Sequence, residues 1–413
     1  MIDKLPIKTK SLLINSSLYV GMFVVILAVF YFFPVSYVYL ISEDTWAEYA
    51  TTTAFLAGAA LLLWTMIRDR SARTIVNTAL LLFMVFVGME EISWGQRIFG
   101  ISTPDYFLEA NHQRELNLHN LHFVKYTKML FHNGVAFWLV LSWIGWERLG
   151  LLGRLLKRLK APSIPSYTAP YFLLALVFAW FGIIPKSEEL NELIFAYGFA
   201  FLSMDIYYET RPAPIRDRLH IAPNFLLTGT IVLSALFLSA KWPWDWSLSN
   251  RMNLFAAREY PRLNMHEQSE KVYAYLVENP SLRNPDTLYN YGMYRRERGD
   301  EAGSRALLAM AVEENRGKIE KGPVTGADWF RMAKFYHALS SPADERRSLL
   351  KAIELYTVEI RGLEEGIRSG KLIKKLAVMN LNQAYHNIAE AYEKTGQKAM
   401  ARKYQEAAAA LSV

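Results

Sequence analysis

Two polar blocks hold most of the residues in this sequence whose side chains could do chemistry. The first follows a strongly apolar segment and begins with the adjacent carboxylates Glu90 and Glu91. The second block, residues 111–122, contains Glu115 and three of the eight histidines of the chain. Carboxylates and imidazoles are common general acids and bases, and both bind metals. Their density beside an apolar segment indicates a site at the end of a membrane span.

A helix over residues 112–122 would place four of these side chains on one face. Their spacing is i, i+3, i+7 and i+10, and they are His112, Glu115, His119 and His122. Such a face could hold a divalent metal such as zinc through His112, His119 and His122, with a glutamate as general base for a metal-bound water. The catalytic candidates are Glu90, Glu91, Glu115 and His119.

Amide, guanidinium and carboxylate groups near these residues are candidates for binding a ligand. They are Gln96, Arg97, Asn111, Asn117, Asn120 and Glu192. Glu192 lies just inside an apolar segment, where an ionisable side chain is costly and is often functional, although it could also serve the helix N-terminus. Three interpretations stay open: a metal site, a metal-free catalytic or ligand site, and a hydrogen-bonded network that only holds a loop in place. Ser93 has no histidine or aspartate partner at a recognisable spacing, which argues against a serine hydrolase.

Apolar residues make up 52% of the chain and are unevenly distributed. Residues 12–240 contain long uncharged runs, whereas residues 250–413 alternate charged and apolar positions. The absence of cysteine excludes disulfides and thiolate metal sites. We predict an all-α protein: a polytopic membrane helical bundle in residues 1–246, with a polar loop at 90–127, followed by a soluble helical domain in residues 247–413.

Seven apolar stretches are long enough, or nearly so, to cross a bilayer. They lie near residues 14–36, 50–67, 74–90, 128–146, 169–185, 190–207 and 222–240. Alternate connections carry 14 basic residues on one side and 6 on the other up to Trp246. The positive-inside rule then predicts a bacterial cytoplasmic-membrane protein with a cytoplasmic N-terminus and an extracytoplasmic C-terminal domain. Since most of the net positive charge falls in cytoplasmic connections, a nucleic-acid partner is not expected.

Helical periodicity in the C-terminal half is interrupted near Gly299, Ser340 and Gly396. Aligned on these breaks, the segments around Trp329 and Tyr385 place large aromatic and small residues as in a helical-hairpin repeat. The pattern resembles the tetratricopeptide repeat, although the breaks are 41 and 56 residues apart, where about 34 is usual. The first unit also departs from the repeat, with arginine at 295 and serine at 304. The resemblance implies a surface that docks a periplasmic protein or peptide; a helical cap that braces the membrane half is the alternative.

The polar pattern of the membrane half resembles that of uncharacterised bacterial multi-pass membrane proteins, a likeness that implies no activity. The leading hypothesis is an envelope enzyme acting on a membrane lipid or lipid-linked glycan at the outer leaflet. The second is a non-enzymatic assembly or scaffold protein that works through its repeat domain, and the third is a transporter. The sequence leaves open whether the chain is an enzyme.

Overall fold

The computed structural model of the chain is built from helices. It describes residues 7–42, 45–111, 114–118, 120–121, 127–165, 168–181, 184–185, 188–211, 221–241, 245–370 and 374–411. Among these residues there is no β-strand, only one isolated antiparallel bridge between Asn111 and Leu121. The chain divides into two compact units, Met1–Arg251 and Met252–Val413.

Each of the seven apolar stretches of the first unit contains a helix. These helices are α1 (Ile7–Phe32), α3 (Trp46–Arg68), α4 (Ile75–Glu91), α7 (Thr127–Ile144), α9 (Ala169–Phe181), α10 (Glu188–Glu209) and α12 (Ile221–Lys241). The first predicted stretch extends to residue 36, but α1 ends at Phe32. Pro34 explains the difference, since a proline lacks the amide hydrogen that a continuing helix would need. A second, short helix, α2 (Pro34–Leu40), begins at this proline.

Helix α10 forms the centre of the first unit. Most of its side chains are buried, and it packs against α3 and α9. The α3 backbone approaches closely at Gly58, where an added Cβ would lie 3.0 Å from the Cα of Ala200. The core helix is therefore held by small residues that allow close contact and by aromatic side chains such as Phe195 and Phe201, which are buried.

The outward faces of these helices carry many large apolar side chains that are exposed. Examples are Val20, Val25, Leu63, Trp64, Leu82, Phe137, Trp143, Leu173, Phe181, Leu233 and Phe237. By length and hydropathy, one helix among the described residues, Trp46–Arg68, is sufficient to cross a membrane. Shorter apolar helical stretches occur at Phe23–Phe32, Met129–Ile144, Ala169–Phe181 and Thr228–Leu238.

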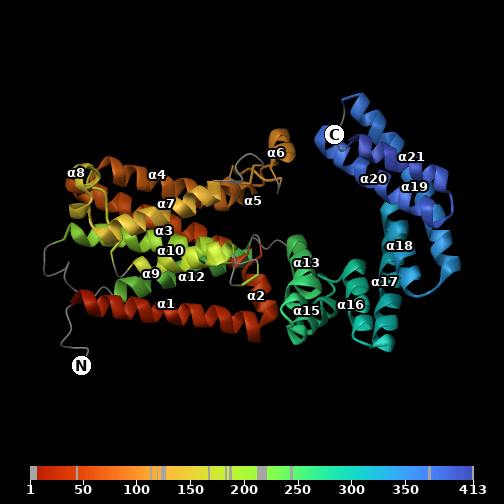
Figure 1. Cartoon of the computed structure of the whole chain (residues 1–413), viewed down its shortest axis with the longest axis horizontal. Coiled ribbons are helices and arrows are strands. Elements are labelled where there is room, and N and C mark those ends of the chain that lie inside the picture. The colour runs from red at the N-terminus through yellow and green to blue at the C-terminus, as the bar shows by residue number, and fades with distance from the viewer. Residues whose placement is uncertain are drawn as a thin grey trace. The chain divides into compact units, whose positions relative to one another are not determined.

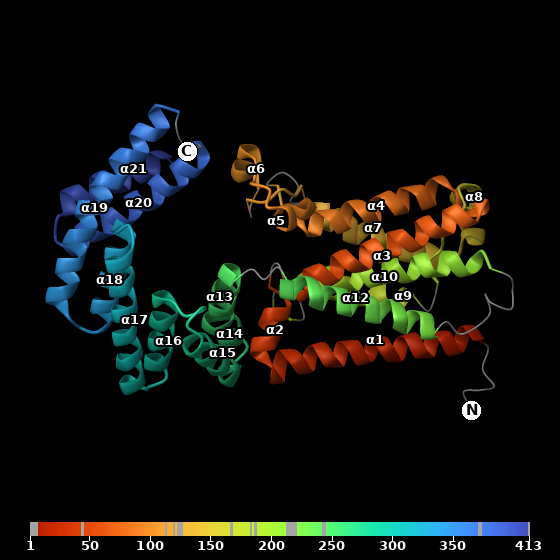
Figure 2. The ribbon, with the colours of Figure 1, turned by 180° about the vertical axis from the view of Figure 1, so that it is seen from behind.

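The two ends of the first unit differ in charge. The start of α1 and the short helix α8 (Gly150–Arg158) lie at one end, and α2, α5 (Gln96–Phe99) and α6 (Asp105–Ala110) lie at the other (Figures 1 and 2). Because α3 ends and α4 begins at the α8 end, the basic residues between them lie at that end. Glu90 and Glu91 are the last two residues of α4, so they lie at the opposite end.

The second unit is a series of helical hairpins. Its main helices are α15 (His266–Glu278), α16 (Pro285–Glu297), α17 (Glu301–Lys321), α18 (Gly326–Ala338), α19 (Pro342–Arg368), α20 (Lys374–Lys394) and α21 (Lys398–Leu411). Three further segments lead into it: α13 (Asp245–Leu254), a π-helical turn (Phe255–Glu259) and α14 (Tyr260–Arg262). Helices α16 and α17, α18 and α19, and α20 and α21 pair as neighbours in sequence.

The three breaks predicted in this unit coincide with the turns of the hairpins. Gly299, Ser340 and Gly396 have φ angles of 84°, 58° and 85°, which lie in the left-handed region that ends helices. The wide spacing of the breaks has a simple cause. Helices α17, α19 and α20 contain 21, 27 and 21 residues, so the lengthened helices account for the extra residues between turns.

Candidate functional site

The backbone leaves α4 through an unusual turn. Ser93, Trp94 and Gly95 have consecutive positive φ angles of 46°, 56° and 75°. Glycine adopts this conformation freely, but for serine and tryptophan it costs on the order of 1–3 kcal/mol each. Such a conformation persists only where surrounding contacts determine it. The contacts that hold this turn come from the second polar block.

Glu90 joins the turn to the second polar block. Its side chain is buried, and both carboxylate oxygens accept hydrogen bonds. The indole nitrogen of Trp94 donates to Oε1 over 2.5 Å, and the backbone amide of Leu118 donates to Oε2 over 2.6 Å. Glu90 therefore links α4 to a segment 28 residues further along the chain.

A second group of contacts surrounds Ser93. Its hydroxyl donates to Oε2 of Glu115 over 2.7 Å and accepts from Nδ2 of Asn117 over 3.1 Å. Asn111 donates in turn to the backbone carbonyl and the side-chain oxygen of Asn117, over 2.8 and 2.7 Å. Sequence spacing missed the carboxylate partner of Ser93, because Glu115 lies 22 residues away and no short motif links the two.

Gln96 fixes the remaining side of the loop. Its Oε1 accepts from the backbone amide of Leu116 over 2.8 Å, and its Nε2 donates to the hydroxyl of Thr103 over 2.5 Å. That hydroxyl donates to the backbone carbonyl of Arg114. The amides of Gln96, Asn111 and Asn117, expected to bind a ligand, thus form hydrogen bonds within the loop itself. We call the residues joined by these contacts the polar loop network: Glu90, Ser93, Trp94, Gln96, Thr103, Asn111, Arg114, Glu115, Leu116, Asn117 and Leu118.

The expected helix over residues 112–122 is wrong for the part of this segment that the structure describes. Residues 114–118 and 120–121 form bends and turns, and Asn111 pairs with Leu121 across the loop. Arg114 has a φ of 59°, outside the helical region. Asparagine side chains that bond to nearby backbone groups compete with helix formation, which gives the physical reason. Glu115 and the other described residues of this segment therefore do not lie on a helical face.

Several predicted residues lie at the limits of the described chain. His112, His119 and His122 fall outside the described residues, as does the side chain of Arg97, whose backbone belongs to α5. Asn120 lies in a turn and is partly buried. The histidine part of the predicted metal site therefore stays a prediction.

A separate cluster of carboxylates forms between α4 and α10. Glu91, Glu189 and Glu192 each offer an oxygen atom, and these atoms all lie within 4.8 Å of one another. Glu91 is buried, whereas the other two are partly buried. We call these three residues the carboxylate triad. Adjacent positions on α4 thus have different surroundings, because Glu90 belongs to the polar loop network and Glu91 to the triad.

The triad has a definite chemical character. Three carboxylates at this separation repel one another when ionised, so a proton or a cation close to them is favoured. Oxygen ligands of this kind suit hard divalent cations such as magnesium, calcium and manganese, and zinc also accepts them. Glu91 and Glu192 are among the site residues predicted from the sequence, whereas Glu189 is not. The contact depends on α4 and α10 lying together at their ends, which spacing along the chain does not reveal.

His132, near the start of α7, and Asn191, near the start of α10, lie beside one another close to the triad. The imidazole of His132 stacks on Phe195 at a centroid distance of 5.4 Å and an interplanar angle of 11°. Its Nε2 lies 3.4 Å from Nδ2 of Asn191. Asn191 is buried, and within the described part of the chain its Oδ1 has no hydrogen-bond partner. Asn191 directly precedes Glu192, so polar groups from α4, α7 and α10 gather at the same end.

No family model, curated protein or solved structure matches this chain.

Proposed function

We propose that the first unit crosses a bacterial cytoplasmic membrane seven times, with the α8 end in the cytoplasm. The exposed apolar side chains of its helices support this, because water would disfavour them and lipid would cover them. The charge difference between the ends also supports it, since cytoplasmic connections are enriched in lysine and arginine. In this orientation the polar loop network, the carboxylate triad and the second unit are extracytoplasmic.

We infer that the triad end of the first unit acts on the polar part of an envelope lipid or lipid-linked glycan. The observation that carries this proposal is the convergence of Glu91, Glu189 and Glu192 from two helices, with one carboxylate buried. At the end of an apolar bundle such groups would meet lipid headgroups. A shared proton or a bound divalent cation at the triad would supply acid–base or Lewis-acid chemistry there.

The polar loop network has a different task in this proposal. Glu90, Ser93 and Asn117 hold a strained turn directly after the helix that carries Glu91. Their hydrogen bonds fix the end of α4 and so the position of its last carboxylate. They are positioning residues, and the triad carries the chemistry.

A non-enzymatic scaffold is the second candidate. The saturation of Glu90, Gln96 and Asn117 by contacts within the loop favours it, because these residues then serve structure alone. In this interpretation the second unit, as a tetratricopeptide-like array, binds a periplasmic protein or peptide, and the first unit is its anchor. A transporter is the third candidate, and no observation favours it.

Lipid analysis of cells that express the full chain tests the enzyme proposal. We compare the wild type, Glu91→Gln and the matched control Glu188→Gln, which changes an exposed residue in the first turn of α10. Lipid extracts are resolved by mass spectrometry, and protein abundance is measured by immunoblot. We expect a lipid or lipid-linked glycan to change in amount with the wild type and the control but not with Glu91→Gln. Identical lipid profiles with and without an abundant wild-type chain would favour the scaffold.

A further inference from the structure

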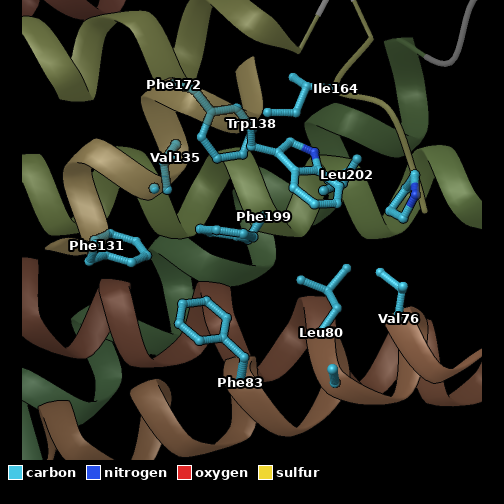
Figure 3. Close-up of a pocket in the computed structure, with 13 residues that line it drawn as sticks. Val76, Leu80, Phe83, Phe131, Val135, Trp138, Ile164, Phe172, Phe199 and Leu202 are labelled. Carbon is cyan, nitrogen blue, oxygen red and sulfur yellow. The ribbon is translucent and has the colours of Figure 1, made fainter. Parts of the chain in front are cut away.

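An apolar cavity of about 380 Å³ lies between α4, α7, α9 and α10. Figure 3 shows Val76, Leu80 and Phe83 of α4 on one side, facing Phe131, Val135 and Trp138 of α7. Phe172 of α9 and Phe199 and Leu202 of α10 complete the wall, and Pro162 and Ile164 also line it. None of the described residues that line this cavity has a charged side chain.

The cavity opens on the outward face of the unit. Ala79 and Gly134 line it and are exposed, whereas Val135, Phe172 and Leu202 line it and are buried. Its volume falls within the range of roughly 300–1,000 Å³ that is common for small-molecule sites. The shape is thus a chamber with a buried apolar wall and an apolar rim.

The position of the cavity along the helices suits one leaflet of a bilayer. The lining residues of α4 run from Val76 to Phe83, in the half of the helix nearest α8. At about 1.5 Å per residue this stretch is roughly 10 Å long. One leaflet of the hydrocarbon core is about 15 Å thick, so the chamber fits within the leaflet at the α8 end.

Basic residues adjoin the cavity at that same end. Arg73 lies three residues before Val76, and Lys160 lies two residues before Pro162. Both are exposed. Hydrogen bonds from Ser71, followed by the positive charges of Arg211 and Lys160, hold the pKa of the Asp69 carboxyl below its ordinary value. Positive charge is therefore concentrated where a lipid headgroup would lie if an acyl chain entered the cavity.

A second apolar cavity provides a contrast. It has a volume of about 480 Å³ and lies between α1, α9, α10 and α12. Two of its lining residues have acidic neighbours in the sequence. Glu48 lies two residues after Trp46, and Glu189 directly precedes Leu190. Because acidic neighbours repel an anionic headgroup, the first cavity is the better site for an anionic lipid.

We propose that the first cavity binds an acyl chain of an anionic phospholipid from the cytoplasmic leaflet, with the phosphate near Arg73 and Lys160. The proposal rests on the membrane location proposed above but is independent of any chemistry at the carboxylate triad. Basic residues at the cytoplasmic ends of spans attract anionic headgroups, and an apolar chamber open to the bilayer accepts the chain. Together they select both the charge and the leaflet of the bound lipid.

Photolabelling of the full chain in vesicles tests this site. The vesicles consist of phosphatidylcholine doped with phosphatidylglycerol that carries a diazirine at the end of one acyl chain. The matched probe is phosphatidylcholine with the same diazirine chain. Labelled positions are identified by mass spectrometry of peptides from α4 and α7. We expect the anionic probe to label the cavity residues roughly tenfold more than the neutral probe, which corresponds to about 1.4 kcal/mol.

Two variants and their controls separate the parts of the site. Ala79→Phe fills the cavity from its rim, and Leu82→Phe places the same ring on an exposed position of α4 outside it. Lys160→Gln removes the proposed headgroup charge, and Lys157→Gln removes a charge that pairs with Glu147. We expect Ala79→Phe to abolish cavity labelling by either probe and Lys160→Gln to abolish only the preference for the anionic probe. Both controls should behave as the wild type.

The other outcomes overturn the proposal in distinguishable ways. Equal labelling by the two probes would exclude selection of anionic lipid. Labelling of exposed positions such as Leu82 and Trp143 without the cavity residues would show that no chain enters. If neither set is labelled, the first unit does not lie in the bilayer, and both this inference and the proposed membrane location fail.

Discussion

Adjacent glutamates at the end of α4 have opposite roles in this structure. The carboxylate of Glu90 accepts from the Trp94 indole and the Leu118 amide, whereas Glu91 faces two other carboxylates. Two glutamates next to each other in the sequence can therefore have quite different surroundings. What decides them is the side of the helix on which each side chain emerges, and substitutions at the two positions should separate structure from function.

We expect Glu90→Ala to destabilise the full chain. It removes the buried carboxylate that accepts from the indole and the amide, and a hydrogen bond to a charged group contributes about 1.5–3 kcal/mol. The measurement is the thermal unfolding midpoint in detergent, together with the abundance of the variant in membranes. Thr78→Ala, at an exposed position near the start of the same helix, serves as the control. A variant as stable and abundant as the wild type would show that the polar loop network does not need Glu90.

In the presence of a metal chelator, we expect the Glu91→Gln variant to unfold at a higher temperature than the wild type. The same substitution should abolish the proposed activity on an envelope lipid. The neutral amide relieves repulsion among the triad carboxylates, whereas the ionised group is the one that chemistry would need. Added manganese should stabilise the wild type and have less effect on the variant. If the chelator leaves the wild type more stable than Glu91→Gln, the three carboxylates do not repel, and the triad is a protonated or internally paired structural group.

At the scale of single elements, sequence pattern predicted the helices better than the loop. Apolar stretches and break residues such as Gly299 located the helices of both units, because helix formation depends mainly on local periodicity. Pro34 is an exception, since the predicted stretch 14–36 runs through it, whereas α1 ends at Phe32. The polar loop network was not predictable in the same way. Its conformation depends on Glu90 and Ser93 bonding to residues 22 to 28 positions away, and a run of asparagine and glutamate is compatible with helix or loop until those contacts form.

The hairpins of the second unit depend on small residues where helices meet. Ala333 and Ala389 are both buried, and Ala333 belongs to the core that contains Phe330, Tyr356 and Ile388. We expect Ala333→Leu or Ala389→Leu to cost roughly 1–3 kcal/mol by overpacking. Hydrogen exchange of the full chain, read on peptides of α18 to α21, measures this locally. Ala327→Leu on the exposed side of α18 is the control, and unchanged protection in both core variants would contradict the repeat alignment.

Arginine at position 295 explains how the first hairpin departs from the repeat pattern. Its guanidinium lies 3.0 Å from Glu270 of α15 and 2.9 Å from Asp300 at the turn, and it donates to the Tyr291 hydroxyl. The hydrogen bonds that Arg295 donates to Tyr291 and Asp300 raise the pKa of its guanidinium further above the ordinary value. Arg295 thus forms two ion pairs at a position where the tetratricopeptide pattern usually has an aromatic side chain.

The capping box of α18, formed by Thr325 and Asp328, should make the stability of the start of this helix depend on pH. Asp328 accepts from the hydroxyl and backbone amide of Thr325 and pairs with Arg331, and these contacts outweigh burial and lower its pKa. A lowered carboxyl pKa means that the stabilisation is present above the pKa of the unfolded chain and is lost as pH falls through the folded value. We expect exchange protection at the start of α18 to fall with acidification below about pH 4 in the wild type. Asp328→Asn should lack this dependence, and an equal acid response in both would contradict it.

At the scale of the whole molecule, the separation of charge in the first unit has a consequence for both units. In the topology proposed above, the basic connections at the α8 end and the carboxylates at the other end lie on opposite sides of a membrane. Since α12 ends at Lys241, at the end opposite its start, the second unit would then lie on the same side as the carboxylate triad. A partner docked on the hairpins and a lipid bound at the triad would share one compartment.

We expect reporter fusions to report this topology directly. Alkaline phosphatase fused after Asn250 should be active, because the enzyme folds only after export, and a fusion after Lys160 in the basic connection should be inactive. A cytoplasmic fluorescent reporter at the same two positions should give the reverse pattern, which controls for expression. Activity after Lys160 and none after Asn250 would invert the orientation, and the triad would then face cytoplasmic substrates. Activity at neither or at both positions would mean that the number of spans between them is even, so one of the seven helices, most readily the short α9 of 13 residues, would not cross.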